Sequence, residues 1–257
     1  MDITPTAANA DIPSAFCRTF TPPWKSKVMS LDSIAIFKGM TSEAVGRLGH
    51  GSTVLEPRDG AEVFAQGDPA DGVYAITGGD GHVRIGAIDR RSKALMVEIF
   101  RAGETFGEIA VIDGGSRTTA AVAEGKVRLV KIRPQAFISA LADCPSLGEA
   151  LCLVLAQRLR RTYGLFQDAT FETLEVRFAR QVLYLAAGES RPTQQGLRLA
   201  HRLRQADLAD LLGATTRSII TILNAWRAAG LVVYDTDRAL LTVTDMAAMR
   251  AIVAGSD

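Results

Sequence analysis

The chain has 257 residues, and its 29 lysines and arginines balance 28 aspartates and glutamates to a formal net charge of +1. Apolar residues make up 47% and charged residues 22%, which excludes a wholly disordered chain and a small disulfide scaffold. This length favours two compact units over one. No apolar run approaches the ~18 residues that a membrane span needs, so we expect a soluble protein without a membrane partner.

The N-terminal segment and the cysteines indicate the compartment. Residues 1–30 are rich in Ala, Pro, Thr and Ser without a sustained period, which predicts a flexible tail. The segment lacks a basic stretch followed by an apolar core, so we do not expect a secretory signal. Cys17, Cys144 and Cys152 are odd in number and lack metal-ligand spacing, which fits a metal-free protein in a reducing cytoplasm.

After two short helical patterns, which begin at Leu31 and Thr41, the chain changes in texture. Between residues 51 and 133, short stretches of alternating hydrophobicity are separated by glycine-rich turns. Several short strands at this spacing predict a β-sandwich or barrel without a long helix. The expected strands include residues 62–64, 73–76, 82–85, 95–99 and 127–130.

A long helical period begins at Pro145. Side chains recur at intervals of three and four residues, as in the a/d seam that two parallel helices share. The seam comprises Cys152, Leu155, Leu159, Thr162 and Phe166. A second stripe, expected to cover the sandwich, comprises Leu147, Leu151, Val154 and Leu165. A buried helix in a monomer is the alternative, but the seam is narrow beside Arg158, Arg160 and Arg161, which favours a homodimer.

The C-terminal segment has the spacing of a winged helix-turn-helix, after a helix expected at about 171–187 and a linker at 188–192. Residues 205–212 predict the first helix, Gly213 a left-handed turn, and Thr215 the cap of a second helix that ends at Trp226. Residues 230–234 and 240–243 predict the wing. The expected core comprises Leu208, Leu212, Ile219, Ile222 and Leu223, with Ala209 at the close helix crossing.

Polar side chains of the second helix are candidates for contact with double-stranded DNA. Thr216, Arg217 and Thr221 are expected at base edges, where arginine can pair bidentately with guanine. The remaining candidates, expected at phosphates or beside the groove, are Gln205, Thr215, Ser218, Asn224 and Arg238. Such a module can instead bind proteins. Six arginines but one acid between residues 177 and 204 favour DNA, because phosphate neutralisation supplies most non-specific affinity.

The most specific pattern lies at residues 106–120, with the sequence FGEIAVIDGGSRTTA. Backbone N–H groups after Gly107 can hold phosphate oxygens at a helix N-terminus, and Arg117 can neutralise the same phosphate. Glu108 can accept a hydrogen bond from a ribose hydroxyl. An acid and a base nine residues apart usually form a surface ion pair, but the complete string between strands of a glycine-rich sandwich is more specific.

This string resembles the phosphate-binding cassette of cyclic-nucleotide-binding domains. With the seam helix and the helix-turn-helix, residues 31–243 resemble the CRP/FNR transcription regulators. The resemblance implies an α+β fold in three units: a jelly-roll (double-stranded β-helix) domain at 31–143, a central dimerisation helix at 144–168 and a winged helix-turn-helix at 169–257. It also implies a homodimer in which cyclic nucleotide repositions the DNA-binding modules on a two-fold-related operator, with RNA polymerase as a further partner.

The family's ligand contacts carry over to matching positions of this chain. Glu108 would take the ribose hydroxyl and Arg117 the cyclic phosphate, while Thr162 would reach the purine from the central helix. The complete candidate set is Gly107, Glu108, Ile109, Ala110, Arg117, Thr118, Thr119, Thr162 and Tyr163. The implied effector is cyclic AMP or cyclic GMP, with no prosthetic group.

Three positions depart from the family pattern. Tyr163 replaces a small hydroxyl residue, so base contacts across the dimer can differ. Thr118 favours cyclic GMP in related domains, where its hydroxyl accepts from the guanine 2-amino group. Thr216, Arg217 and Ser218 replace a frequent Arg-Glu-Thr, so the operator sequence, the target genes and the choice between activation and repression stay open.

Other functions of the same fold are alternatives. Members of the family sense redox state, haem-bound gases or cyclic dinucleotides, or act without a ligand. Cys17 stands alone where an iron–sulfur sensor needs a cluster, and His82 is a lone candidate for a haem ligand. No nucleophile elbow, paired metal-binding histidines or P-loop is present, so we do not expect an enzyme.

Overall fold

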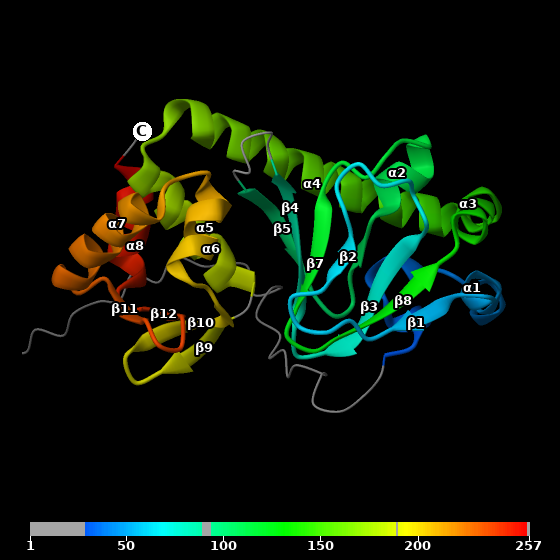
Figure 1. The fold of residues 1–257 in the computed structure, drawn as a ribbon, viewed down its shortest axis with the longest axis horizontal. Helices are drawn as coiled ribbons and strands as arrows, with labels where there is room; N and C mark the ends of the chain where they lie inside the picture. Colours follow the sequence, from blue (N-terminus) through cyan, green and yellow to red (C-terminus); the bar gives the residue numbers. More distant parts are fainter. Residues whose placement is uncertain (1–28, 89–93, 189, 256–257) are drawn as a thin grey trace, which may run out of the picture.

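The computed structural model describes residues 29–88, 94–188 and 190–255, which form two domains connected by a long helix (Figure 1). The predicted tail and Cys17 lie outside these ranges, except for the tail's last two residues. The Met29 backbone N–H donates to the Thr77 carbonyl at 2.8 Å, so the chain is attached to the first domain from this point on.

The N-terminal domain consists of short helices and two antiparallel four-stranded sheets. Their orders are β1-β8-β3-β6 and β2-β7-β4-β5. In chain order the elements are η1 (Leu31–Ser33), η2 (Ala35–Phe37), α1 (Ser42–Gly49), β1 (Thr53–Leu55), β2 (Glu62–Phe64), β3 (Val73–Gly79), β4 (His82–Ile88), β5 (Ala94–Phe100), β6 (Thr105–Phe106), α2 (Glu108–Asp113), β7 (Ala120–Glu124), β8 (Val127–Ile132) and α3 (Pro134–Asp143). The predicted β-roll is confirmed, and α2 is its only helix between residues 53 and 132 of the described chain.

Strand β3 separates two apolar cores because successive side chains of a strand point to opposite faces. Tyr74 and Ile76 lie between the two sheets with Phe106 and Leu129. Val73 and Ala75 point to the other face, where they contact the short helices and the start of the long helix. The strand is buried on both sides, so its sequence lacks the polar alternation of a half-exposed strand.

The long helix, α4 (Pro145–Phe171), has 27 residues and connects the domains. Leu147 and Leu151 are buried against the N-terminal domain, as the second stripe predicts. Leu165 departs from that prediction, because it lines a cavity between α4 and the C-terminal helices. In the described chain no single helix is long and apolar enough to cross a membrane. Helices α3 and α4 reach that length and apolar composition only when taken together, and the chain is bent by 109° between them.

The C-terminal domain contains α5 (Leu174–Gly188), β9 (Ser190–Thr193), β10 (Gly196–Arg202), α6 (Gln205–Leu212), α7 (Thr216–Ala228), β11 (Val232–Asp235), β12 (Leu240–Val243) and α8 (Met246–Ala254). The predicted linker at 188–192 is wrong: β9 pairs with β10, and the wing extends to a four-stranded sheet of order β11-β12-β10-β9. Pro192 is tolerated because β9 is an edge strand, whose outer N–H positions need no partner.

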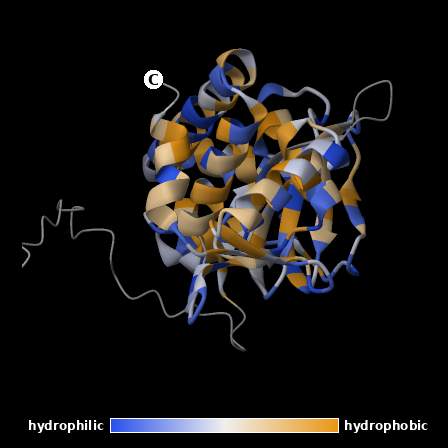
Figure 2. Ribbon diagram, turned by 90° about the vertical axis from the view of Figure 1, so that its left-hand side faces the viewer, coloured by the Kyte–Doolittle hydropathy of each residue, from blue (hydrophilic) through white to orange (hydrophobic). Residues whose placement is uncertain are grey.

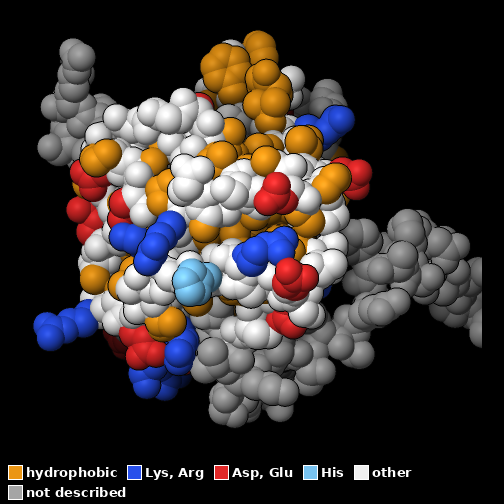
Figure 3. Space-filling model, turned by 90° about the vertical axis from the view of Figure 1, so that its right-hand side faces the viewer, with side chains coloured by type: hydrophobic (Ala, Val, Ile, Leu, Met, Phe, Trp, Pro, Cys, Tyr) orange, Lys and Arg blue, Asp and Glu red, His pale blue; other side chains and the backbone are white. Residues whose placement is uncertain are grey.

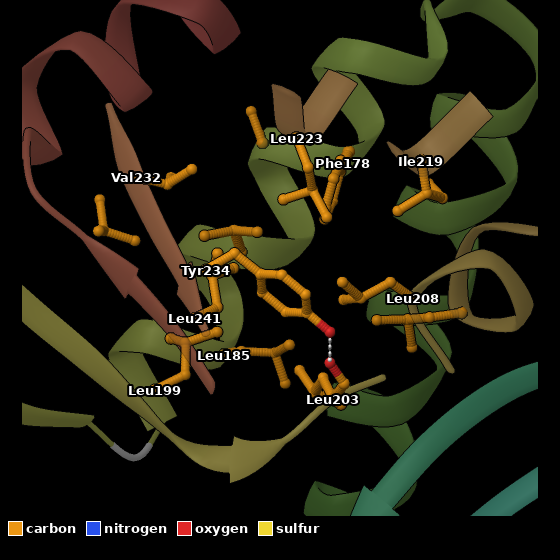
Figure 4. Close-up of a cluster of buried hydrophobic side chains, with 14 of the residues drawn as sticks. Phe178, Leu185, Leu199, Leu203, Leu208, Ile219, Leu223, Val232, Tyr234 and Leu241 are labelled. Atoms are coloured by element: carbon orange, nitrogen blue, oxygen red, sulfur yellow. Dashed lines mark hydrogen bonds between the residues drawn. The ribbon is translucent and has the colours of Figure 1, made fainter. Parts of the chain in front are cut away.

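The helix-turn-helix packs on this sheet through one apolar core (Figure 4). Tyr234 reaches into this core and donates its hydroxyl proton to the Leu203 carbonyl at 2.9 Å. Trp226 stacks on Phe178 with ring centroids 4.7 Å apart. Figure 2, which views this side of the molecule, shows apolar and hydrophilic residues along the same helices, as amphipathic packing requires. The predicted turn at Gly213 is confirmed, with φ of 60°.

Candidate functional site

The cassette begins where strand β6 ends and helix α2 starts. Gly107 stands at this junction with φ of 80°, a left-handed conformation that suits glycine. A Cβ atom here would lie 2.8 Å from an Arg117 guanidinium nitrogen, so the close approach of backbone and guanidinium also requires glycine. The predicted short helical turn after Gly107 is confirmed as α2.

Arg117 is buried, with 3% of its surface exposed, and most of its donors have partners. Its guanidinium donates to the carbonyls of Gly107 (2.6 Å) and Gly72 (2.8 Å) and to Oδ1 of Asp71 (2.7 Å). The guanidinium carbon lies 4.2 Å from the centroid of the Phe64 ring. Its Nε has no hydrogen-bond partner among the described residues, so one donor is left for a ligand.

Asp71 is the anion that balances this arginine. Lys131 Nζ contacts its Oδ2 at 2.7 Å, and the Tyr74 hydroxyl donates to it at 3.0 Å. Partial burial acts to raise the pKa of Asp71, but hydrogen bonds from Lys131 and Arg117 outweigh burial and hold it below its ordinary value. Burial and the same carboxylate raise the pKa of Tyr74, so its hydroxyl stays a donor.

Glu108 lies on the opposite wall and is 2% exposed. Its Oε1 is 2.7 Å from a guanidinium nitrogen of Arg158 on α4. Arg158 also donates to the Thr105 carbonyl at 2.7 Å and lies over the Phe100 ring. The second carboxylate oxygen of Glu108, Oε2, is buried without a partner among the described residues, so it is an acceptor without a donor.

These groups enclose a cavity of about 170 Å³. Its lining comprises Phe64, Ile85, Glu98, Phe100, Phe106, Gly107, Glu108, Ile109, Ala110, Arg117, Thr118, Thr119 and Arg158. The seven candidate ligand residues of the β-roll therefore lie around one space. Sequence reasoning missed Asp71 and the apolar walls, and it considered Arg158 only as a neighbour of the seam. One wall has an unpartnered donor, the other has an unpartnered acceptor, and apolar side chains lie between them. This arrangement suits a ligand with an anionic group, a hydroxyl and a flat ring.

Thr162 and Tyr163 are not brought into this cavity. Thr162 lies one helical turn beyond Arg158, and its hydroxyl donates to the Arg158 carbonyl at 2.9 Å. Tyr163 is 60% exposed. Both side chains therefore lie on the solvent-facing part of α4 in a single protomer.

The candidate DNA-contacting residues come from α6, α7 and the wing, and most of them are exposed. Thr215 caps α7, since its hydroxyl accepts from the Ser218 N–H at 3.2 Å. The side chains of Thr216, Arg217, Thr221 and Asn224 on α7 are exposed, whereas Ser218 is half-buried. Gln205 begins α6 and is half-buried, and Arg238 projects from the wing with its side chain 75% exposed.

Arg217 and Thr221 are four residues apart and share a helix face. Thr221 donates to the Arg217 carbonyl at 3.0 Å. No ion pair in the described chain holds the Arg217 guanidinium, so it is available to an external acceptor. The arrangement presents one cation and several hydroxyls along the start of a helix, which is suited to a nucleic-acid groove.

Comparison with known proteins identifies a family for each of the two domains. The cyclic nucleotide-binding domain family matches residues 55–144, and the Crp-like helix-turn-helix domain family matches residues 176–252. A CRP-like cAMP-activated global transcriptional regulator from Mycobacterium tuberculosis is 34% identical over 221 residues, which covers 84% of this chain and 96% of that protein. The cyclic AMP receptor protein of Thermus thermophilus is 27% identical over 198 residues, covering 77% and 87%.

Solved structures share the fold. The c-di-GMP responsive regulator CLP of Xanthomonas campestris superimposes with a TM-score of 0.69 at 22% identity, covering 80% of this chain and all of that one. FixK2 of Bradyrhizobium japonicum superimposes with a TM-score of 0.68 at 18% identity, covering 78% of this chain and 96% of that one. The chain belongs to the CRP/FNR family of transcription regulators. It is a DNA-binding regulator that carries a cyclic nucleotide-binding domain.

Replacement of Asp71 by asparagine tests the charge balance around Arg117. We expect the free energy of unfolding to fall by about 1–2 kcal/mol at neutral pH. The loss is kept this small because Asp71 is 46% exposed and solvent screens its charge. Because the folded pKa is lowered, the wild-type advantage is complete above the ordinary pKa of 3.8 and is lost as pH falls through the folded value. Urea unfolding at a series of pH values measures this difference. The exposed Asp143→Asn is the matched control, and a gap that does not change with pH contradicts the assignment.

Proposed function

We propose that the chain is a homodimeric transcription regulator whose DNA affinity is controlled by cyclic AMP or cyclic GMP. The observation that carries this proposal is the cavity in which Arg117 and Glu108 are buried with one unpartnered polar atom each. The M. tuberculosis relative, which is described as cAMP-activated, supports the same class of effector. The proposed units stay 31–143, the central helix from 144 and the DNA-binding domain, with the helix continuing to Phe171 rather than 168.

In this proposal the cyclic phosphate lies at Arg117 and the ribose at Glu108. The phosphate competes with the Asp71 carboxylate for the guanidinium, while the ribose 2′-hydroxyl donates to Glu108 Oε2. The purine then lies against the apolar walls formed by Ile85 and Phe100. Charge-assisted hydrogen bonds of this kind are the strong ones, so most of the binding energy comes from the phosphate and ribose.

The choice between the two nucleotides depends on the purine edge. Thr118 lines the cavity and can accept a hydrogen bond from the guanine 2-amino group. One such bond contributes about 1 kcal/mol, or several-fold in affinity. We therefore propose that cyclic GMP competes with cyclic AMP in this protein.

A second copy of the chain is the proposed occupant of the exposed stripe on α4. Leu159 is 53% exposed and Phe166 68% exposed, and they are seven residues apart on one helix face. Figure 3 shows apolar side chains projecting at the top of the molecule, the level at which α4 runs in Figure 1. Monomeric proteins rarely leave such a stripe in water. Pairing of two α4 helices would cover it and bring Thr162 and Tyr163 of each protomer beside the partner.

Two α7 helices related by the dimer axis would enter successive major grooves, about 34 Å apart on one face of the duplex. Arg217 would pair with guanine, and the hydroxyls of Thr216 and Thr221 would contact neighbouring base edges. We propose phosphate contacts for Thr215, Ser218 and Asn224, and further backbone contacts for Gln205 and Arg238. The cytoplasm is the proposed compartment and RNA polymerase the further partner.

Calorimetric titration of the purified protein with cyclic AMP and cyclic GMP, side by side, tests the effector. Arg117→Ala is expected to abolish binding of both nucleotides, because it removes the phosphate's cation. Thr118→Ala is expected to weaken cyclic GMP several-fold and leave cyclic AMP within twofold, as one hydrogen bond of about 1 kcal/mol requires. Failure of the wild type to bind either nucleotide refutes the proposed effector, and binding of cyclic AMP alone refutes the part assigned to Thr118.

Sedimentation of Leu159→Arg tests the dimer. A charge placed in a closely packed seam stays desolvated without a partner, so we expect the monomer to predominate at concentrations where the wild type is dimeric. Arg160→Gln, an exposed change on the same helix, is expected to leave the dimer intact. A wild type that sediments as a monomer refutes the dimer, and a dimeric Leu159→Arg places the interface elsewhere.

Arg217→Ala tests base recognition. It is expected to cost about 1–3 kcal/mol on the preferred duplex, a loss of roughly 5- to 150-fold, and to relax the choice of base at one position in each half-site. Nucleotide affinity should not change. Selection from a random duplex pool followed by anisotropy titration measures both effects. Equal losses on all sequences would assign Arg217 to a phosphate instead.

A further inference from the structure

Glu98 on β5 lies between the nucleotide cavity and the C-terminal domain. One side of it borders the cavity that also contains Arg158 and Phe100. The other side borders a small space whose lining includes Arg161 of α4 and Tyr184 of α5. Only 17% of the Glu98 side chain is exposed, so a change on either side acts on the same partly buried carboxylate.

The side chains of Glu98, Arg161 and Tyr184, here called the triad, each contact the other two. Arg161 Nε is 2.9 Å from Glu98 Oε2, and the Arg161 guanidinium carbon is 3.4 Å from the centroid of the Tyr184 ring. The Tyr184 hydroxyl is 3.5 Å from Glu98 Oε1. Burial, followed by the Glu98 carboxylate, raises the pKa of Tyr184, so the hydroxyl keeps its proton and can donate. Arg161 Nε makes no hydrogen bond among the described residues, so its contact with Glu98 is an ion pair, and the guanidinium is held by this pair and by the ring face.

The position of Arg161 connects this set to the ligand site. Arg158 and Arg161 are three residues apart on α4, so they lie side by side on the helix surface. Arg158 holds Glu108, the proposed ribose acceptor, while Arg161 holds Glu98. Ile99, the next residue of β5, is buried in the core of the C-terminal domain with Leu208 and Leu212 of α6. The segment that lines the cavity is therefore also a docking surface for the helix-turn-helix.

We propose that Glu98, Arg161 and Tyr184 are positioning residues that transmit nucleotide occupancy to the DNA-binding domain, an inference that rests on the proposed function. An N–H group of a bound purine, the adenine 6-amino group or the guanine N1–H, competes with Arg161 and Tyr184 for the oxygens of Glu98. When the contacts of Arg161 and Tyr184 with the Glu98 carboxylate are lost, the Arg161–Tyr184 stack is released. Helix α5 then shifts relative to α4. The nucleotide acts by binding the two arrangements with different affinities, which is the only way a ligand can change their populations.

The test uses Arg161→Gln and Tyr184→Leu, since neither residue borders the nucleotide cavity. The readout is the ratio of DNA affinities with and without nucleotide, measured by anisotropy on a duplex that the wild type selects from a random pool. We expect both variants to reduce this ratio by about fivefold or more, within the usual range of allosteric coupling. Their nucleotide affinity, measured by calorimetry on the DNA-free protein, should be retained or rise slightly, because the cavity lining is unchanged and a competitor for Glu98 has been removed.

Two controls separate this coupling from general damage. Arg160→Gln removes the same charge from an exposed neighbour on α4, and Tyr184→Phe keeps the ring beneath the guanidinium. We expect Arg160→Gln to keep the wild-type ratio, and Tyr184→Phe to restore most of what Tyr184→Leu loses. Hydrogen exchange of α5 and α6 without nucleotide gives an independent readout. Exchange should be faster than in the wild type in Arg161→Gln and Tyr184→Leu, but not in the two control variants.

The outcomes distinguish this inference from the proposed function. A wild type whose DNA affinity is insensitive to both cyclic nucleotides overturns the proposed function and the triad together. A wild type that responds, with Arg161→Gln keeping the full ratio and normal exchange, overturns the triad alone. Where Tyr184→Leu fails to fold, Arg161→Gln decides the question, because the Arg161 side chain is partly exposed, at 18%, and glutamine keeps the first part of its aliphatic chain.

Discussion

The structure of the sensor domain depends on keeping the Arg117 guanidinium charged inside the β-roll. A buried cation is costly unless it is paired and hydrogen-bonded. Two carbonyls, one carboxylate and one aromatic face meet that requirement here, and they fix Gly107, Gly72, Asp71 and Phe64 in place. The cassette therefore needs its left-handed glycine and its nearby aspartate for the same reason. A phosphate that entered this space would meet a cation that is already charged, with its Nε free to donate.

The second constraint is the length of α4. A helix of 27 residues spans about 40 Å at 1.5 Å per residue, enough to extend from the base of the β-roll to the helix-turn-helix. Its successive turns contact different parts of the protein. Leu147 and Leu151 anchor it, Arg158 contacts Glu108, and Arg161 contacts Glu98 and Tyr184. One helix therefore contacts both the wall of the cavity and the C-terminal domain.

Sequence reasoning predicted the elements whose signals are local. The cassette glycine, the cap at Thr215 and the turn at Gly213 each depend on a few neighbouring residues, and all three have the expected geometry. It missed interactions between distant segments: Asp71 is 46 residues from Arg117, and Glu108 is 50 from Arg158. It also missed the β9–β10 hairpin, because Pro192 and several arginines mask the alternation of an edge strand whose partner is fixed by tertiary contacts.

The placement of Thr162 explains why one protomer does not account for the whole proposed sensor. Its hydroxyl lies one turn past Arg158, outside the cavity, and next to the exposed Leu159 and Phe166. A purine that extends from Arg117 past Glu108 would leave the β-roll at this turn of α4. There it would meet the same surface that a second α4 is proposed to cover. Nucleotide binding and helix pairing would then share residues, and each would strengthen the other by the same factor, as linkage requires.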